Sequence, residues 1–218
     1  MDGRAIDDLR RLASLDDELA ARERRLQELD ETVREVRGRA EALEAFFAGH
    51  DDAERRTRSA IESAEAEVER RRAEVAEAKS ALDGARDDDR RELARRALAR
   101  AEDHLSVAEI ALGRASTDAA QLEHAAADWQ RELPLIEDRA RQLSRDLGDA
   151  KPPASGAPAL IAWASHAHAS LFVAVRQLEA ERERVIREAN ELASALVGEP
   201  TYGSTPAQAL SRVERVTS

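Results

Sequence analysis

The chain has no cysteine, and this absence limits the chemistry that its side chains can perform. Disulfide bonds, thiolate metal sites and cysteine nucleophiles are all excluded. The sequence also lacks a phosphate-binding loop, a dinucleotide-binding glycine pattern and a Gly-x-Ser-x-Gly turn. We therefore expect a protein that is not an enzyme, with no catalytic residues, no metal site and no cofactor.

Aromatic residues make up only 3% of the chain, and glycine and proline number 9 and 6 among 218 residues. So few large side chains cannot fill a thick globular core, but they can line narrow seams between helices. Charged residues make up 36% of the chain, which is typical of long helices and coiled coils. The composition therefore predicts an all-α protein.

Positive charge is also in deficit, because the formal net charge at pH 7 is −11. Nucleic acids and anionic lipids both attract proteins with an excess of Lys and Arg. We therefore expect no nucleic acid partner and do not favour a membrane surface. Residues 1–19 are charged and lack the apolar segment of a signal peptide, which favours a cytoplasmic protein.

A seven-residue repeat of apolar side chains begins near the N-terminus. Its first and fourth positions, called a and d, form a seam. Up to residue 47 they hold Leu12, Leu15, Leu19, Arg22, Leu26, Leu29, Val33, Val36, Ala40, Leu43 and Phe47. Residues 48–52 resemble the end of a helix, yet the repeat continues in phase to Leu82. A loop at this point would preserve the phase by chance in about one of seven cases. We favour one helix over residues 5–85, with a weak polar heptad around Gly49, rather than a loop at residues 46–54.

A second repeat, out of phase with the first, extends from residue 94 to residue 147. Its a and d positions are Ala94, Leu98, Ala101, Leu105, Ala108, Leu112, Ala115, Ala119, Leu122, Ala126, Trp129, Leu133, Ile136, Ala140, Leu143 and Leu147. Between the two repeats, Gly84 can end a helix, and Asp89 and Glu92 fit a capping box. We predict an antiparallel hairpin with its tip at residues 84–90, a register that places Val75 opposite Ala101, and a kink near Pro134.

Two further segments follow the hairpin. Residues 149–157 are rich in proline and small residues, which predicts a linker. Residues 158–198 carry a third apolar repeat, and residues 199–218 form a tail with a short helix capped by Thr205 and Gln208. The predicted fold is an elongated antiparallel coiled-coil hairpin, residues 1–148, with the C-terminal helix packing back to form a three-helix section. Residues 1–28 have no partner on the second helix, so they need the C-terminal helix or another subunit.

Residues 152–175 contain no Asp, Glu, Lys or Arg. Alanine dominates, and serine and histidine interrupt the segment, which disfavours both a membrane span and an interfacial helix. Apolar side chains cover more of the helix surface than one seam requires, so we expect two neighbours. The second neighbour is either the hairpin or another subunit. The candidate partner or oligomer interface comprises Leu160, Ile161, Trp163, Leu171, Phe172 and Val175.

Two polar features allow alternative interpretations. His168 falls at a seam position, where it is either an isolated histidine or a pH-sensitive contact. Basic residues gather near the tip, where they either contact an acidic partner or membrane surface, or form a solvated helix start balanced by neighbouring aspartates. The candidate tip contact comprises Arg90, Arg91, Arg95 and Arg96.

The tip also carries a resemblance to a known family. Ala81-Leu82-x-Gly84 followed by Glu92-Leu93-Ala94-Arg95-x-Ala97-Leu98 is similar to the hairpin tip of the phage-shock protein A family of membrane-remodelling coiled-coil proteins. The spacing from Gly84 to Leu93 is longer than in that family, and residues 1–15 have no counterpart of its N-terminal membrane helix. Long hairpins also resemble the arms of chromosome-maintenance proteins, although no ATPase motif is present here.

These observations favour a non-enzymatic structural or adaptor protein that acts through helix–helix contacts. Its partners would be other proteins or, by self-association, further copies of itself. The alternative that the tip resemblance implies is a peripheral membrane-remodelling protein.

Overall fold

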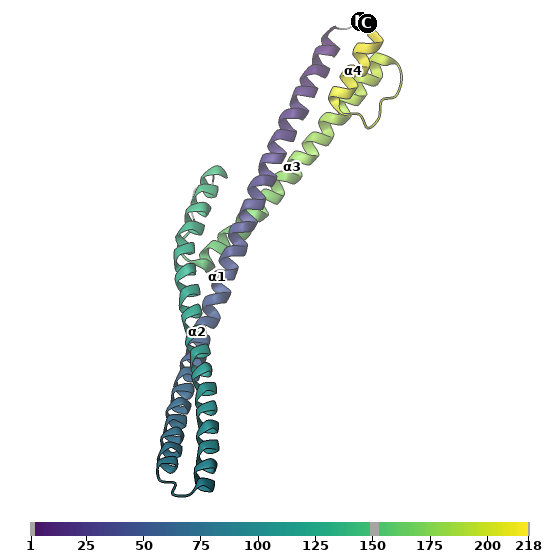
Figure 1. Ribbon diagram of the computed structural model, residues 1–218. Coiled ribbons are helices and arrows are strands. Elements are labelled where there is room, and N and C mark those ends of the chain that lie inside the picture. The colour runs from purple at the N-terminus through teal and green to yellow at the C-terminus, as the bar shows by residue number, and fades with distance from the viewer. Residues whose placement is uncertain (1–2, 149–152, 218) are drawn as a thin grey trace. The chain divides into compact units, whose positions relative to one another are not determined.

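The computed structural model describes residues 3–148 and 153–217, which form helices and no strand. The helices are α1 (Gly3–Asp83), α2 (Asp88–Asp146), α3 (Ala157–Val197) and α4 (Pro206–Thr217), as Figure 1 shows. The predicted fold class is confirmed: α1 and α2 form the hairpin, and α3 packs back against α1.

The chain divides into two compact units. Unit 1 comprises Met1–Glu41 and Ile136–Ser218, and unit 2 comprises Ala42–Leu135. From the sequence, the whole hairpin, residues 1–148, was expected to be one domain. In the structure, the boundary between the two units crosses both long helices. On α2 it falls directly after Pro134 and Leu135, and α2 continues through the proline as a helix.

Helix α1 is continuous across Gly49, so the loop considered at residues 46–54 does not form. A glycine inside a helix costs about 1 kcal/mol relative to alanine. Aromatic contacts bracket this position: the Phe46 ring lies 5.2 Å from Phe47 and 5.4 Å from His50, centroid to centroid. Because the heptad phase is preserved, these side chains remain on the packed side of the helix.

The hairpin tip lies between Asp83 and Asp88. Gly84 N–H donates to the Ser80 carbonyl at 3.0 Å and ends α1. The N-cap of α2 is Asp87, whose Oδ1 accepts the N–H of Arg90 at 2.8 Å. The predicted capping box of Asp89 and Glu92 is therefore wrong, and Glu92 instead accepts the Nε–H of Arg96. Three consecutive aspartates can all cap a helix, and the closure of the tip decides which one does.

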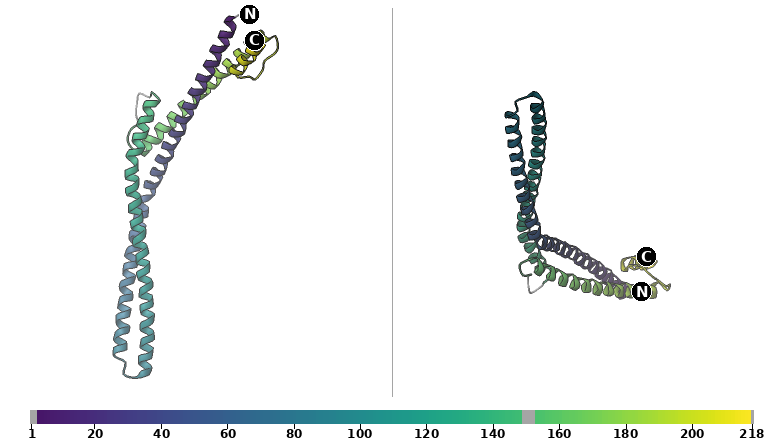
Figure 2. Two further views of the ribbon diagram at one scale, coloured as in Figure 1. Left: turned by 45° about the horizontal axis from the view of Figure 1, so that its top comes forward. Right: turned by 90° about the horizontal axis from the view of Figure 1, so that it is seen from below.

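In unit 2, α1 and α2 lie side by side and antiparallel, as both views of Figure 2 show. Val68, Val75, Ala101 and Ala108 are buried there, which agrees with the predicted opposition of large and small residues. Two ion pairs join the helices, Arg72 to Glu109 at 3.7 Å and Lys79 to Glu102 at 4.0 Å. The partners are one heptad apart on both helices, so both pairs fit a single register.

In unit 1, the beginning of α1 packs with α3 and α4, which supplies the partner that residues 1–28 required. The buried cluster there contains Leu9, Leu12, Leu19, Val185, Ala189, Ala193, Ala209 and Val213. Residues 209 and 213 are one helical turn apart, so α4 presents a single apolar stripe to the cluster. Each fully buried Leu or Val contributes about 1.5–3 kcal/mol of hydrophobic free energy.

Further along unit 1, three helices each bury apolar residues. They are Leu29, Val33, Val36 and Ala40 of α1, Ile136, Ala140 and Leu143 of α2, and Leu160, Trp163, Ala164, Ala167 and Leu171 of α3. Gly156 N–H, just before α3, donates to Glu137 Oε1 of α2 at 2.9 Å. This hydrogen bond holds the beginning of α3 against the end of α2 and completes the predicted three-helix section.

The ends of α3 and α4 follow the predicted signals. Gly198 has φ 75° and its N–H donates to the Ser194 carbonyl, which ends α3 in the left-handed conformation that glycine favours. Thr205 and Gln208 form the predicted capping box, with reciprocal hydrogen bonds of 3.0 and 3.3 Å. Residues 149–152 of the predicted linker lie outside the described residues.

Candidate functional site

The six residues predicted as a partner interface divide into two groups. Leu160, Trp163 and Leu171 are buried within the chain itself, at 0, 8 and 3% exposure. Ile161 and Val175 are half-buried, and Phe172 is 56% exposed. The chain's own helices therefore cover one side of α3, while the other side remains open to solvent.

The open side of α3 forms a surface that we call the α3 outer face. It consists of Ala162, His166, Ala169, Phe172 and Val173, all exposed. Between Pro153 and Val175 the described chain has no Asp, Glu, Lys or Arg. Arg176 borders this surface, with its guanidinium 5.4 Å from the Phe172 ring centroid and 3.0 Å from Glu179. An exposed helix face without charge is unusual in a chain this highly charged.

Two polar contacts between α1 and α3 occupy partly buried positions. Arg182 Nε donates to Asp16 Oδ1 at 2.7 Å, and His168 Nδ1 contacts Asp30 Oδ1. Both carboxylate side chains are almost enclosed, at 8 and 11% exposure. The hydrogen bond that Arg182 donates to Asp16, together with the charges of Asp16 and Glu23, raises the pKa of Arg182 above its usual value.

These pairs share one spacing. Asp16 and Asp30 are two heptads apart on α1, and His168 and Arg182 are two heptads apart on α3, so both pairs require the same antiparallel register. Of these four residues, only His168 was singled out from the sequence, and the aspartates lie outside the a and d positions of α1. The shared spacing of fourteen residues is the signal that would have found them.

The candidate tip arginines are all exposed, and most have local acidic partners. Arg90 pairs with Asp87, Arg91 with Asp88 and Arg96 with Glu92, each within one helical turn. No ion pair is formed by Arg95 within the described chain. Asp87, Asp88 and Glu92 thus balance the positive charge of the arginines, as expected for a solvated helix start.

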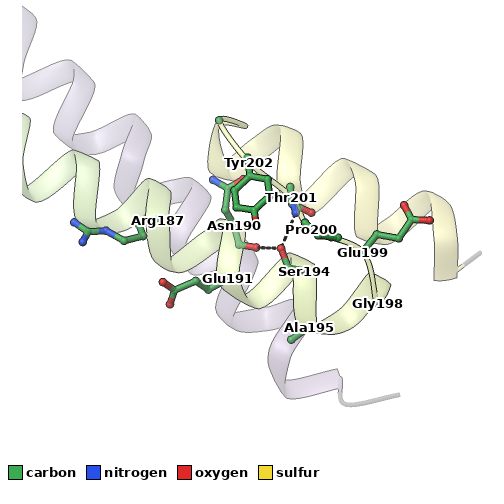
Figure 3. A pocket seen from close by; sticks show the side chains of 11 residues that line it. Arg187, Asn190, Glu191, Ser194, Ala195, Gly198, Glu199, Pro200, Thr201 and Tyr202 are labelled. Atoms are coloured by element: carbon green, nitrogen blue, oxygen red, sulfur yellow. Dashed lines mark hydrogen bonds between the residues drawn. The ribbon is translucent and has the colours of Figure 1, made fainter.

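A groove with a cavity volume of about 740 Å³ lies where α3 meets the segment that leads to α4 (Figure 3). Asn190 holds this segment to α3, because its Nδ2 donates to the carbonyls of Ile186 and Ser204. Ser194 Oγ accepts the N–H of Thr201 at 2.7 Å. These hydrogen bonds position α4 on the core, and we assign the groove to the packing of this connection.

A second cavity, of about 410 Å³, lies along the seam of unit 2, and we call it the seam pocket. Its α1 side includes His50, Glu54 and Thr57, which occupy three consecutive seam positions directly after Gly49. Its α2 side includes the residues opposite them, Ala126, Leu122 and Ala119. Polar side chains of α1 thus face mostly small side chains of α2, and the cavity results from that combination.

Two general features of the described chain bear on function. By length and composition alone, α3 is the one described helix that could cross a membrane, and 28% of its most apolar window is buried. No group of three or more His, Asp or Glu side chains in residues 3–148 and 153–217 is arranged to hold a metal ion.

Comparisons of the chain with known protein families, with characterised proteins and with solved structures found no match. The resemblance of residues 81–98 to the phage-shock protein A family is therefore accompanied by no detectable similarity over the rest of the chain.

Proposed function

We propose that this protein is a structural or adaptor protein that acts through helix–helix contacts and self-associates through the α3 outer face. The observation that carries this proposal is the exposure of Phe172 and Val173, 56 and 54%, within a segment that has no charged residue. Water contact with these side chains is unfavourable, and a second helix that covers them would recover the hydrophobic free energy.

A second copy of the chain is the partner that this surface fits best. In a twofold interface the same patch of both copies meets, so any charge in the patch would be buried against that patch and would need a complement within it. The α3 outer face has no charge to repel its own copy. It also combines small residues, Ala162 and Ala169, with a large one, Phe172, so the ring of one copy can fit over the alanines of the other.

The test compares two valine substitutions. Val173→Glu places a charge on the α3 outer face, and Val107→Glu places the same charge on the exposed outer side of α2, where Val107 is 67% exposed. We expect the parent protein and the Val107→Glu variant to form oligomers at micromolar concentration in light scattering. The Val173→Glu variant should be monomeric, because the interface would bury two carboxylates, one from each copy, in a patch that offers no cation. A monomeric parent protein, or an oligomer that survives Val173→Glu, would contradict the proposal.

The second candidate function is a peripheral membrane protein, and the outer side of α2 favours it. Leu93, Val107 and Ile110 are 69, 67 and 54% exposed, and Arg100 and Arg114 occupy the same heptad position as Leu93 and Val107. Apolar and basic residues on one helix face are typical of helices that bind anionic lipid surfaces. Flotation with anionic liposomes separates the two functions, because an adaptor stays at the bottom of the gradient and a membrane protein rises. Loss of flotation in Val107→Glu would assign the binding to α2.

A further inference from the structure

The seam pocket lies in the part of the unit 2 seam where polar side chains occupy consecutive seam positions of α1. His50, Glu54 and Thr57 stand at consecutive seam positions where Leu, Val, Ile or Ala would be expected. Across from them, Ala119 and Ala126 are too small to fill the space between the helices. The result is a cavity of about 410 Å³, which lies within the range of small-ligand sites in proteins.

An aromatic group borders one end of the pocket. The Phe46 ring on α1 lies 6.4 Å from the Trp129 ring on α2, one turn from His50, so the two rings span the seam there. The His50 ring packs against Phe46, and its Nδ1 is buried without a hydrogen-bond partner in the described chain. The floor is apolar, with Ile61 and Leu122. The pocket therefore offers an apolar surface beside this aromatic group.

The rim of the pocket has an excess of negative charge. Arg58, the cation among its lining residues, is already paired with Glu54 at 2.6 Å. Glu62 of α1 and Glu123 of α2 also line the pocket, and neither forms an ion pair in the described chain. A ligand with a positive charge would be attracted to this rim, whereas an anion would be repelled.

We propose that the seam pocket binds a small organic cation with an apolar body, such as an arylalkyl ammonium. The apolar body would occupy the space that seam side chains leave empty over Ile61 and Leu122. The ammonium group would lie at the acidic rim, beside the carboxylate of Glu62 or that of Glu123. A docked partner helix fits less well, because charged and polar residues line both sides of the pocket. The pocket is also short, since it extends along α1 only from residue 50 to residue 62.

The probe for the test is 2-phenylethylammonium, titrated into the full-length protein and followed by backbone amide shifts in NMR. We expect saturable binding with a dissociation constant of about 0.1–10 mM, which is typical of a ligand of this size in an open pocket. The amides that shift should be those of residues 50–62 and 119–130. The neutral isostere 2-phenylethanol should bind at least about fivefold more weakly, because it lacks the charge. Absence of saturable shifts in those residues, or equal affinity for the two probes, would overturn the proposal.

Two variants locate the site. Thr57→Leu restores an apolar seam residue and fills the pocket, so binding should be lost while the thermal midpoint stays equal or rises. Glu62→Gln with Glu123→Gln should weaken binding about fivefold. Its control is Glu65→Gln with Glu77→Gln, which removes the same charge from exposed positions of α1 that do not line the pocket. Unchanged affinity in Thr57→Leu, or equal weakening in the control pair, would show that the cation binds elsewhere.

Discussion

Asp16 and Asp30 are acidic side chains that unit 1 encloses between α1 and α3. An enclosed carboxylate is unfavourable unless a cation and hydrogen bonds compensate for its lost hydration. Arg182 compensates Asp16, while His168 and Arg34 both contact Asp30. Because the two contacts fit the same alignment of α1 and α3, a shift by one helical turn would separate Asp16 from Arg182 and Asp30 from His168. Asp30 would keep Arg34 of its own helix. We infer that these pairs select the register rather than add net stability.

Arg182→Ala tests this inference for a single side chain. The substitution leaves the Asp16 carboxylate enclosed without its cation, so we expect a loss of about 2–3 kcal/mol in the free energy of unfolding. Arg184→Ala, an exposed position on the same helix, should change it by less than about 0.5 kcal/mol. Replacing both Asp16 and Arg182 with leucine should be close to neutral. Urea unfolding provides the measurement, and equal effects of the two alanine variants would contradict the role of Arg182.

The ends of the helices follow local rules, except where several residues can fill the same role. Gly198 ends α3 and the pair Thr205 and Gln208 begins α4, as their types and spacing indicate. At the tip, Asp87, Asp88 and Asp89 are equivalent by type. The N-cap must have an extended backbone, and only Asp87 lies where the chain leaves the turn.

Two aspartate variants test this assignment. Asp87→Ala removes the hydrogen bond to Arg90 N–H and should reduce stability by about 1 kcal/mol, with faster amide exchange in the first turn of α2. Asp89→Ala removes a carboxylate that caps nothing, so we expect little change. Hydrogen exchange measured for residues 88–92 would reveal the difference. A larger effect at Asp89 than at Asp87 would contradict the cap.

The chain is built as two units that share α1 and α2 but have separate buried residues. Unit 1 has three-helix packing, with many fully buried side chains. In unit 2 two helices face each other, and seam residues such as Ile61 and Leu112 are only half-buried. Two helices expose more of their seam than three, which explains why the cavity in the hairpin seam lies in unit 2.

Leu9→Ala tests the independence of the units. Leu9 has 0% exposure in the α1, α3 and α4 cluster, so its truncation should cost about 2–5 kcal/mol. Hydrogen exchange should show lost protection in residues 6–20 and 185–213, while residues 61–115 keep theirs because their contacts lie in unit 2. Val75→Ala should have the opposite pattern. If either variant lost amide protection in both units together, the chain would unfold as one cooperative unit and the prediction would be wrong.

Much of the architecture was accessible from local pattern. The phase of the heptads through Gly49 predicted one continuous helix, and the change of phase near Gly84 predicted the tip. Periodicity also identified the seam side of each helix, because burial repeats with the helical turn. The same pattern marked a weak polar heptad around Gly49 but did not show a cavity, since a cavity depends on what lies opposite.

The amino-acid sequence by itself determined the helices, their seams and the absence of charge between residues 153 and 175. Only the tertiary structure decided which side of α3 is covered, leaving Phe172 and Val173 exposed while Trp163 is buried. It also decided that Arg182 meets Asp16 and that His50, Glu54 and Thr57 border an open pocket. The physical reason is that helix formation depends on neighbours along the chain, whereas burial and ion pairing depend on residues far apart in sequence.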